Sequence, residues 1–327
     1  MENRFNQLVL NKIFKNLDLN SIKSCSLVSK QFNKAFNMDI LWNSLFFIHY
    51  NESIDEYKKI FNTDSYKNTY KKYISLKYLK KIFTLDYTIK NLTSLKELYL
   101  SNKNLISLPT EIRNIVSLQR LYLGNNKLIS IPPEIKYLSL LQCLYLGNNS
   151  LTSIPIEIKN LKSLQLLYLN NNRLTSIPAE IRNLASLQCL YLNNNNITSI
   201  PAEIGNLTSL QILYLDNNNI TSIPSEIKKL TLLRCLYLND NSLTSIPAET
   251  GNLISLQILE LSNNKLTSIP VEMGNLKSLQ RLGLNNNKLT SIPIEIENLP
   301  SLLSLYLKDN NLTSIPTGID NLYLDKN

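Results

Sequence analysis

Histidine is almost absent from this sequence, and cysteine and glycine are scarce. The 327 residues include one histidine, four cysteines and seven glycines. Zinc sites of Cys and His ligands and catalytic triads built on histidine therefore have almost no residues to draw on. No G-x-G-x-x-G or G-x-x-x-x-G-K motif occurs, so a glycine-rich loop that holds phosphates is excluded as well. We expect no catalytic residue, no cofactor and no metal site.

Long apolar runs are also missing. No run of 18 apolar residues occurs, and the N-terminal MENRFNQLVL lacks the basic stretch and apolar core of a secretory signal. We therefore expect no membrane partner and a cytoplasmic location, which would be the host cytoplasm if the source is viral.

The net charge of +9 is concentrated in the first part of the chain. Residues 1–94 hold 15 lysines and arginines against 8 acidic residues, whereas residues 95–327 hold 19 against 17. Most of the excess lies in a lysine-rich stretch from Lys58 to Lys81. Because the longer part of the chain is nearly neutral, we expect no nucleic-acid partner.

A repeat of 23 residues occupies most of the chain. From Leu95 it recurs ten times without an insertion, in the pattern L-x-x-L-x-L-x-x-N-x-L followed by x-S-I-P-x-E-I-x-N-L-x-S. The L-x-L alternation is typical of a short, half-buried strand. Burial of the few inward apolar residues of one unit does not offset the entropy of ordering that unit, so the repeats must stack.

Two polar features recur with the repeat. The asparagine at the ninth position falls where the chain leaves the strand, and its amide can both donate to and accept from backbone groups. It is present in nine repeats, at Asn126, Asn149, Asn172, Asn195, Asn218, Asn241, Asn264, Asn287 and Asn310. The proline of S-I-P-x-E-I stands where a helical turn can begin, with Glu in the first turn. We therefore expect a short 3₁₀ or α turn on the outer face.

This pattern resembles the leucine-rich repeat. The resemblance implies an α/β solenoid of horseshoe shape, with a parallel β-sheet on its concave face. It covers ten repeats in residues 95–324 and leaves residues 325–327 as a tail. Residues 82–94 look like an N-terminal cap or a truncated repeat.

The first 47 residues predict three short helices. The segment from Leu10 to Phe46 resembles an F-box, because it contains the I-x-x-x-L-D pattern, an S-L-V-S-K-x-F run and an L-W pair. The resemblance implies a small all-α domain at residues 1–47 that docks on a Skp-type adaptor subunit. The residues it assigns to adaptor binding are Phe5, Leu10, Ile13, Leu17, Val28, Leu41 and Trp42. The alternative is a plain three-helix cap that shields the first repeat.

Residues 48–81 predict a helical, lysine-rich connector. An apolar stripe that continues to Ile82 would face inward, and the lysines would face solvent. The stripe is Tyr57, Ile60, Tyr70, Tyr73, Leu76, Leu79 and Ile82. A contact surface for an anionic partner is the alternative interpretation of the lysines.

Two columns of the expected sheet vary in ways that suit a binding surface. The fifth repeat position is tyrosine in eight of ten repeats, and Glu260 and Gly283 interrupt the series. The third position is apolar in the middle of the array and carries Arg120 and Arg281 on either side. Tyrosine is a favoured hot-spot residue, although neighbouring tyrosines also stabilise a sheet by themselves. The predicted target-binding residues are Arg120, Tyr122, Tyr145, Leu166, Tyr168, Tyr191, Ile212, Tyr214, Tyr237, Ile258 and Arg281.

The two resemblances together imply a substrate-recognition subunit of a Skp–cullin–F-box ubiquitin ligase. Such a protein is not itself an enzyme, and it would hold an unidentified target protein on its concave face. The alternative is a non-enzymatic leucine-rich-repeat scaffold for a small GTPase, a phosphatase or another signalling protein, in which the N-terminal helices form a cap.

Overall fold

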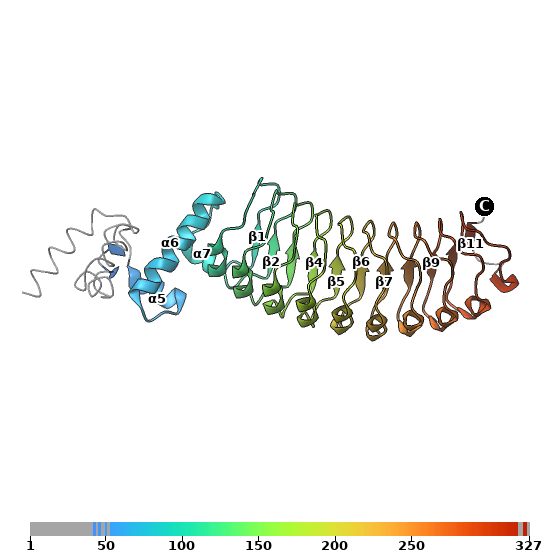
Figure 1. Cartoon of the computed structure of the whole chain (residues 1–327). Coiled ribbons are helices and arrows are strands. Elements are labelled where there is room, and N and C mark those ends of the chain that lie inside the picture. The colour runs from blue at the N-terminus through green and yellow to red at the C-terminus, as the bar shows by residue number, and fades with distance from the viewer. Residues whose placement is uncertain (1–41, 44, 47–49, 51–52, 320–322, 326–327) are drawn as a thin grey trace, which may run out of the picture. The chain divides into compact units, whose positions relative to one another are not determined.

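The computed structural model describes residues 42–43, 45–46, 50, 53–319 and 323–325. The chain divides into two compact units, Met1–Leu95 and Lys96–Asn327. The described residues of the first are mostly in helices, and we call the two the helical unit and the repeat unit. Figure 1 labels helices α5 to α7 of the first unit and most strands of the second.

The helical unit contains helices α5 (Ile54–Phe61), α6 (Tyr66–Ile82) and α7 (Ile89–Thr93). Asn62, in the left-handed conformation, ends α5. The Ser65 hydroxyl accepts a hydrogen bond from the Asn68 N–H at 3.4 Å and so caps the start of α6. Residues 82–94 hold the end of α6 and all of α7 but no strand.

A cluster of aromatic rings lies among the described residues of the helical unit. The ring of Tyr73 lies 4.6 Å from that of Phe46, and 4.8 Å from those of Tyr50 and Tyr57. The expected inward position of Ile82 is wrong, since its side chain is 40% exposed and Phe83 is buried instead. Ile82 is the last residue of α6, and Phe83, the first residue to which the helical spacing no longer applies, takes the inward position.

The repeat unit is one parallel sheet of eleven three-residue strands, taken in chain order. The strands are β1 (Glu97–Tyr99), β2 (Arg120–Tyr122), β3 (Cys143–Tyr145), β4 (Leu166–Tyr168), β5 (Cys189–Tyr191), β6 (Ile212–Tyr214), β7 (Cys235–Tyr237), β8 (Ile258–Glu260), β9 (Arg281–Gly283), β10 (Ser304–Tyr306) and β11 (Tyr323–Asp325). From β1 to β10 the register is the repeat itself, so that Leu121 pairs with Leu144 and Tyr122 with Tyr145. The leucine in the middle of each of these ten strands is buried.

Short 3₁₀ helices connect the strands and form a row of their own beside the sheet (Figure 1). They are η1 (Thr110–Asn114), η2 (Pro133–Tyr137), η3 (Ile156–Asn160), η4 (Ala179–Asn183), η5 (Ala202–Asn206), η6 (Ser225–Lys229), η7 (Ala248–Asn252), η8 (Val271–Asn275), η9 (Ile294–Asn298) and η10 (Thr317–Ile319). A proline directly precedes each of η1 to η9, and a glutamate lies in its first turn. The predicted turn is therefore confirmed, in its 3₁₀ form.

The asparagines of the ninth position connect neighbouring repeats through their amides. The Asn149 side chain donates to the carbonyl of Leu146 at 2.9 Å and to that of Leu123, one repeat back, at 3.0 Å. Its oxygen accepts from the Leu128 N–H at 3.0 Å. One side chain thus satisfies three backbone groups that leave the strands, as the sequence predicted.

The residue before this asparagine, at the eighth repeat position, also shapes the turn, and the sequence analysis missed it. This eighth position is Asn or Asp with a positive φ in all ten repeats, including the first, where Lys103 replaces the asparagine; φ is, for example, 55° at Asn125 and 54° at Asp240. Asn and Asp tolerate this left-handed conformation better than other residues with a side chain. The turn that follows every strand therefore depends on two adjacent polar positions, and the signal for both was present in the sequence.

Candidate protein-binding surface

The eleven residues predicted to bind a target all lie on one face of the sheet, on strands β2 to β9. In each strand the middle leucine points into the core, and the first and third residues point to the opposite face. The first positions supply Arg120, Leu166, Ile212, Ile258 and Arg281, and the third positions supply Tyr122, Tyr145, Tyr168, Tyr191, Tyr214 and Tyr237. We call this surface the concave face. Its binding role stays a prediction.

Seven tyrosines from Tyr99 to Tyr237 form a continuous stack across β1 to β7, the tyrosine ladder. Neighbouring ring centroids are 3.9 to 5.6 Å apart, and their planes differ by 6° to 19°. Stacked rings on adjacent strands stabilise the sheet. Most of the ladder is half-buried, whereas its first ring, Tyr99, is 60% exposed. The ladder therefore supports the sheet and still presents aromatic surface to a partner.

The hydroxyls of Tyr145, Tyr191 and Tyr237 stay protonated at neutral pH. Burial is the largest cause that raises the pKa of Tyr145 and of Tyr237 to about 12, and neighbouring ionisable side chains, first a cysteine in each case, add to it. The pKa of Tyr191 is raised too, again first by burial. These three tyrosines thus offer neutral hydroxyl groups on the aromatic surface of the ladder.

An apolar strip runs beside the ladder in the middle of the concave face. It consists of the half-buried side chains of Leu166, Cys189, Ile212, Cys235 and Ile258. The two thiols are free, and burial raises their pKa values. A thiol with a raised pKa remains uncharged and behaves as a small apolar group rather than a nucleophile.

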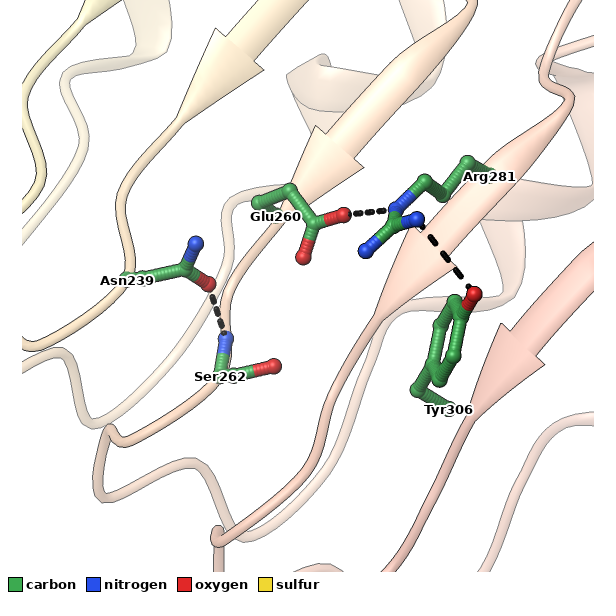
Figure 2. A network of polar contacts seen from close by, with 5 residues as sticks. All are labelled: Asn239, Glu260, Ser262, Arg281 and Tyr306. Atoms are coloured by element: carbon green, nitrogen blue, oxygen red, sulfur yellow. Dashed lines mark hydrogen bonds and ion pairs between the residues drawn. The ribbon is translucent and has the colours of Figure 1, made fainter. Parts of the chain in front are cut away.

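At its C-terminal end the ladder gives way to a charged network (Figure 2). Glu260 replaces the next tyrosine, is only 6% exposed, and forms an ion pair with Nε of Arg281. The Arg281 guanidinium also donates to the Tyr306 hydroxyl at 3.3 Å, and its carbon lies 4.6 Å from the centre of that ring. The main chain beside it is fixed by the Asn239 side chain, which accepts from the Ser262 N–H at 2.7 Å.

Gly283 makes room for this network. A Cβ atom at Gly283 would collide with the carboxylate of Glu260 on the neighbouring strand. The two residues that interrupt the tyrosine series in the sequence therefore act as a pair. One supplies a buried charge, and the other supplies the space that the charge occupies.

The N-terminal end of the ladder carries a second ion pair. Glu97 forms an ion pair with Arg120 and accepts a hydrogen bond from the Tyr99 hydroxyl. The Tyr99 hydrogen bond, followed by that of Arg120, lowers the pKa of Glu97. Both side chains of this pair are substantially exposed, at 33% for Glu97 and 44% for Arg120.

Asp216 is a residue of this surface that the sequence analysis missed. It lines a hollow of about 260 Å³ together with Tyr214, Tyr237, Glu260 and other residues at the end of the ladder. Its carboxylate accepts a hydrogen bond from the Asn239 N–H at 2.7 Å. Burial, the largest cause, and repulsion from Asp240 and Glu260 raise the pKa of Asp216 to about 6, against the effect of that hydrogen bond. In the sequence, Asp216 looked like one more polar turn residue.

The described parts of the chain offer no alternative site of metal chemistry. Within those ranges, no group of three or more His, Cys, Asp or Glu side chains is placed to hold a metal ion. No helix in the same ranges combines the length and the apolar character needed to cross a bilayer.

Of the residues predicted to bind the adaptor, only Trp42 is among those described. Its side chain is fully buried, and its ring lies 5.1 Å from that of Tyr70. Phe5, Leu10, Ile13, Leu17, Val28 and Leu41 lie outside the described residues. Their role stays a prediction.

Family comparisons match both units. An F-box-like family matches residues 8–48. A leucine-rich-repeat family matches residues 117–174 and 139–197, a leucine-rich-repeat region matches residues 178–261, and a further leucine-rich-repeat family matches residues 255–276 and 278–299. No curated protein matches the chain.

Solved structures with leucine-rich repeats are similar to this chain. A leucine-rich-repeat protein of Leptospira interrogans is 39% identical with a TM-score of 0.63, over 72% of this chain and 67% of that one. A plant peptide hormone receptor, RGFR1, solved in complex with RGF2, is 40% identical with a TM-score of 0.62, over 66% of this chain and 36% of the receptor. A TDR receptor is 32% identical with a TM-score of 0.68, over 73% of this chain and 43% of that one.

These similarities agree with the architecture. The 23-residue register, the asparagine hydrogen bonds and the parallel sheet are those of a leucine-rich-repeat array, and the F-box-like match lies ahead of it. Both families are protein-interaction modules. The chain belongs to the F-box proteins with leucine-rich repeats.

Proposed function

We propose that this protein is the substrate-recognition subunit of a Skp–cullin–F-box ubiquitin ligase and acts in the cytoplasm. The observation that carries the proposal is the F-box-like match at residues 8–48 in the same chain as a leucine-rich-repeat array. The F-box-like segment would dock on a Skp-type adaptor, and the concave face would hold a target protein.

The chain contributes binding rather than chemistry in this proposal. It brings a bound target close to a ubiquitin-conjugating enzyme, and the high effective concentration accelerates transfer. An apolar strip beside aromatic rings, with an arginine at each end, supports a protein target, because interface cores are apolar and aromatic with a polar rim.

The proposal is tested by adaptor binding of the full-length chain. We expect the wild type to form a stable complex with a Skp-type adaptor in size-exclusion chromatography, and Leu17→Asp to abolish it. Leu303→Asp is the matched control, since Leu303 is an exposed leucine of the repeat unit, 67% accessible. Circular dichroism of all three chains checks that each is folded.

A folded wild-type chain that binds no adaptor contradicts the proposal. So does a Leu303→Asp chain that loses binding together with Leu17→Asp. Either result leaves the non-enzymatic scaffold as the remaining interpretation, and moves the search to GTPase and phosphatase partners.

A further inference from the structure

The hollow at the end of the tyrosine ladder differs in shape from the rest of the concave face. Tyr214 and Tyr237 form one wall, with rings stacked at a centroid distance of 3.9 Å. Asp216 and Glu260 contribute carboxylates to the same hollow, and Arg281 borders it. Its volume is about 260 Å³, so it accepts the end of one long side chain.

The charges in this hollow are not balanced. Arg281 pairs with Glu260 and is also held against the Tyr306 ring, so its position is fixed. Asp216 has no ion pair with a lysine or arginine among the residues that the structure describes. Its carboxylate receives one hydrogen bond, from the backbone of Asn239. The hollow therefore holds two carboxylates and one cation.

The carboxylate of Asp216 is costly to ionise in this position. The rise of its pKa to about 6 follows first from burial and then from the nearby charges of Asp240 and Glu260. A cation that entered the hollow would remove this cost, because an opposite charge at close range favours the ionised carboxylate. An anion would meet two carboxylates and is disfavoured.

The aromatic wall favours the same kind of occupant. Tyr237 is the last ring of the ladder, so one of its faces has no tyrosine stacked on it. Such a face attracts the ammonium of lysine and the guanidinium of arginine, and Arg281 already packs on Tyr306 in this way. The long aliphatic stems of these side chains suit the adjacent apolar strip, in which Ile258 also lines the hollow.

We propose that this hollow receives the side chain of a lysine or arginine from an extended segment of the target protein on the concave face. The inference rests on the proposed function in that it takes the concave face as the target-binding surface. It adds the chemistry of the target, which must present a basic residue opposite strands β6 to β8.

The test is selection of peptides from a random library on the immobilised full-length chain. We expect the selected peptides to share a lysine or arginine at one position. A selected peptide is then synthesised with its arginine replaced by citrulline, the neutral isostere, or with its lysine replaced by norleucine. The neutral peptide should bind the wild type about tenfold more weakly.

Asp216→Asn is the decisive variant because the chain itself shows that it fits. Asn239 and Asn285 occupy the same repeat position, and each accepts the same backbone hydrogen bond, from Ser262 and Lys308. The variant thus removes the charge and keeps the hydrogen bond. We expect it to bind the basic peptide about tenfold more weakly than the wild type, and to bind the basic and neutral peptides nearly equally.

Asp309→Asn is the matched control, since it removes the same charge from a turn outside the hollow and should behave as the wild type. Peptides without a basic residue, no selected peptide, or equal effects of Asp216→Asn and Asp309→Asn overturn the inference. The adaptor assay at Leu17 uses another unit and another readout. It can therefore fail while the preference for a basic peptide stands, or succeed while that preference is absent.

Discussion

The two ends of the tyrosine ladder carry the same ion-pair chemistry in different surroundings. At the N-terminal end, Glu97 and Arg120 lie on the surface, with side chains 33% and 44% exposed. At the C-terminal end, the Glu260 side chain is 8% exposed, and only its partner Arg281, at 49%, reaches solvent. A buried carboxylate depends on its partner far more than an exposed one does. The C-terminal end is thus the specialised end of the concave face.

We expect the largest difference in stability between the two ends when the arginine is removed from each ion pair. Arg281→Met keeps the aliphatic stem but leaves Glu260 buried without its cation, and it also removes the contact with Tyr306. We expect a loss of about 2 kcal/mol in the free energy of unfolding, below the value for a fully buried pair because Arg281 is half-exposed. Arg120→Met should not change the stability measurably. Urea denaturation measures both, and equal losses would contradict the comparison.

Substitution of a glycine near each end of the ladder gives the next largest expected difference in stability. Gly283→Ala places a methyl group against the Glu260 carboxylate, and the strain should cost about 1–2 kcal/mol of stability. Gly124→Ala, at the N-terminal end, is the control, since its Cβ would lie 3.4 Å from the Gly147 carbonyl oxygen, an ordinary contact. We expect Gly124→Ala to be neutral in thermal denaturation. A neutral Gly283→Ala would show that Glu260 moves freely.

A third difference concerns the 3₁₀ helices, one of which, η7, has a polar residue at a buried position. Thr250 stands where Ile112, Ile135 and other repeats have isoleucine, and its hydroxyl is the one buried side-chain polar atom without a hydrogen-bond partner among the described residues. Thr250→Val removes the hydroxyl and keeps the shape, so we expect a gain of about 1 kcal/mol in urea denaturation. Thr152→Val, at an exposed threonine, is the control and should give no gain. A loss of stability in Thr250→Val would mean that the hydroxyl contributes to stability.

Prediction from the sequence succeeded where the chain repeats itself. The strand, the ninth-position asparagine and the proline recur at the same positions of each repeat, so each structural assignment rests on many copies. It failed at Ile82, where one helix end had to be placed from a single copy. It also missed Asp216, because that residue resembles the asparagines of the other turns. What distinguishes Asp216 is the charge of Glu260, 44 residues later in the sequence, which only the stacked fold brings near.

The ionised Asp216 carboxylate should slightly lower the free energy of unfolding at neutral pH. Its pKa is raised to about 6 by burial and by Asp240 and Glu260, from an ordinary value of 3.8, against the opposing hydrogen bond from Asn239. Arg281, Tyr214 and Tyr237 also border the hollow, and the pKa values of both tyrosines are raised, so neither ionises in this range. Between about pH 4 and pH 6 the folded chain therefore binds more protons than the unfolded chain, and the contribution of Asp216 to stability falls as pH rises.

Asp216→Asn removes this pH-dependent contribution. We expect the variant to be more stable than the wild type at pH 7 by up to about 1 kcal/mol, because solvent screens part of the effect at a half-buried group. The difference should shrink as the pH falls and vanish below about pH 3, where the carboxyl is protonated in both states. Asp309→Asn, which removes the same charge from a turn outside the hollow, is the control. Urea denaturation across this pH range is the measurement, and a stability gain that does not depend on pH would mean that the charge of Asp216 is already neutralised. In that case the hollow would need no cation from a partner, so this small effect bears directly on what the concave face binds.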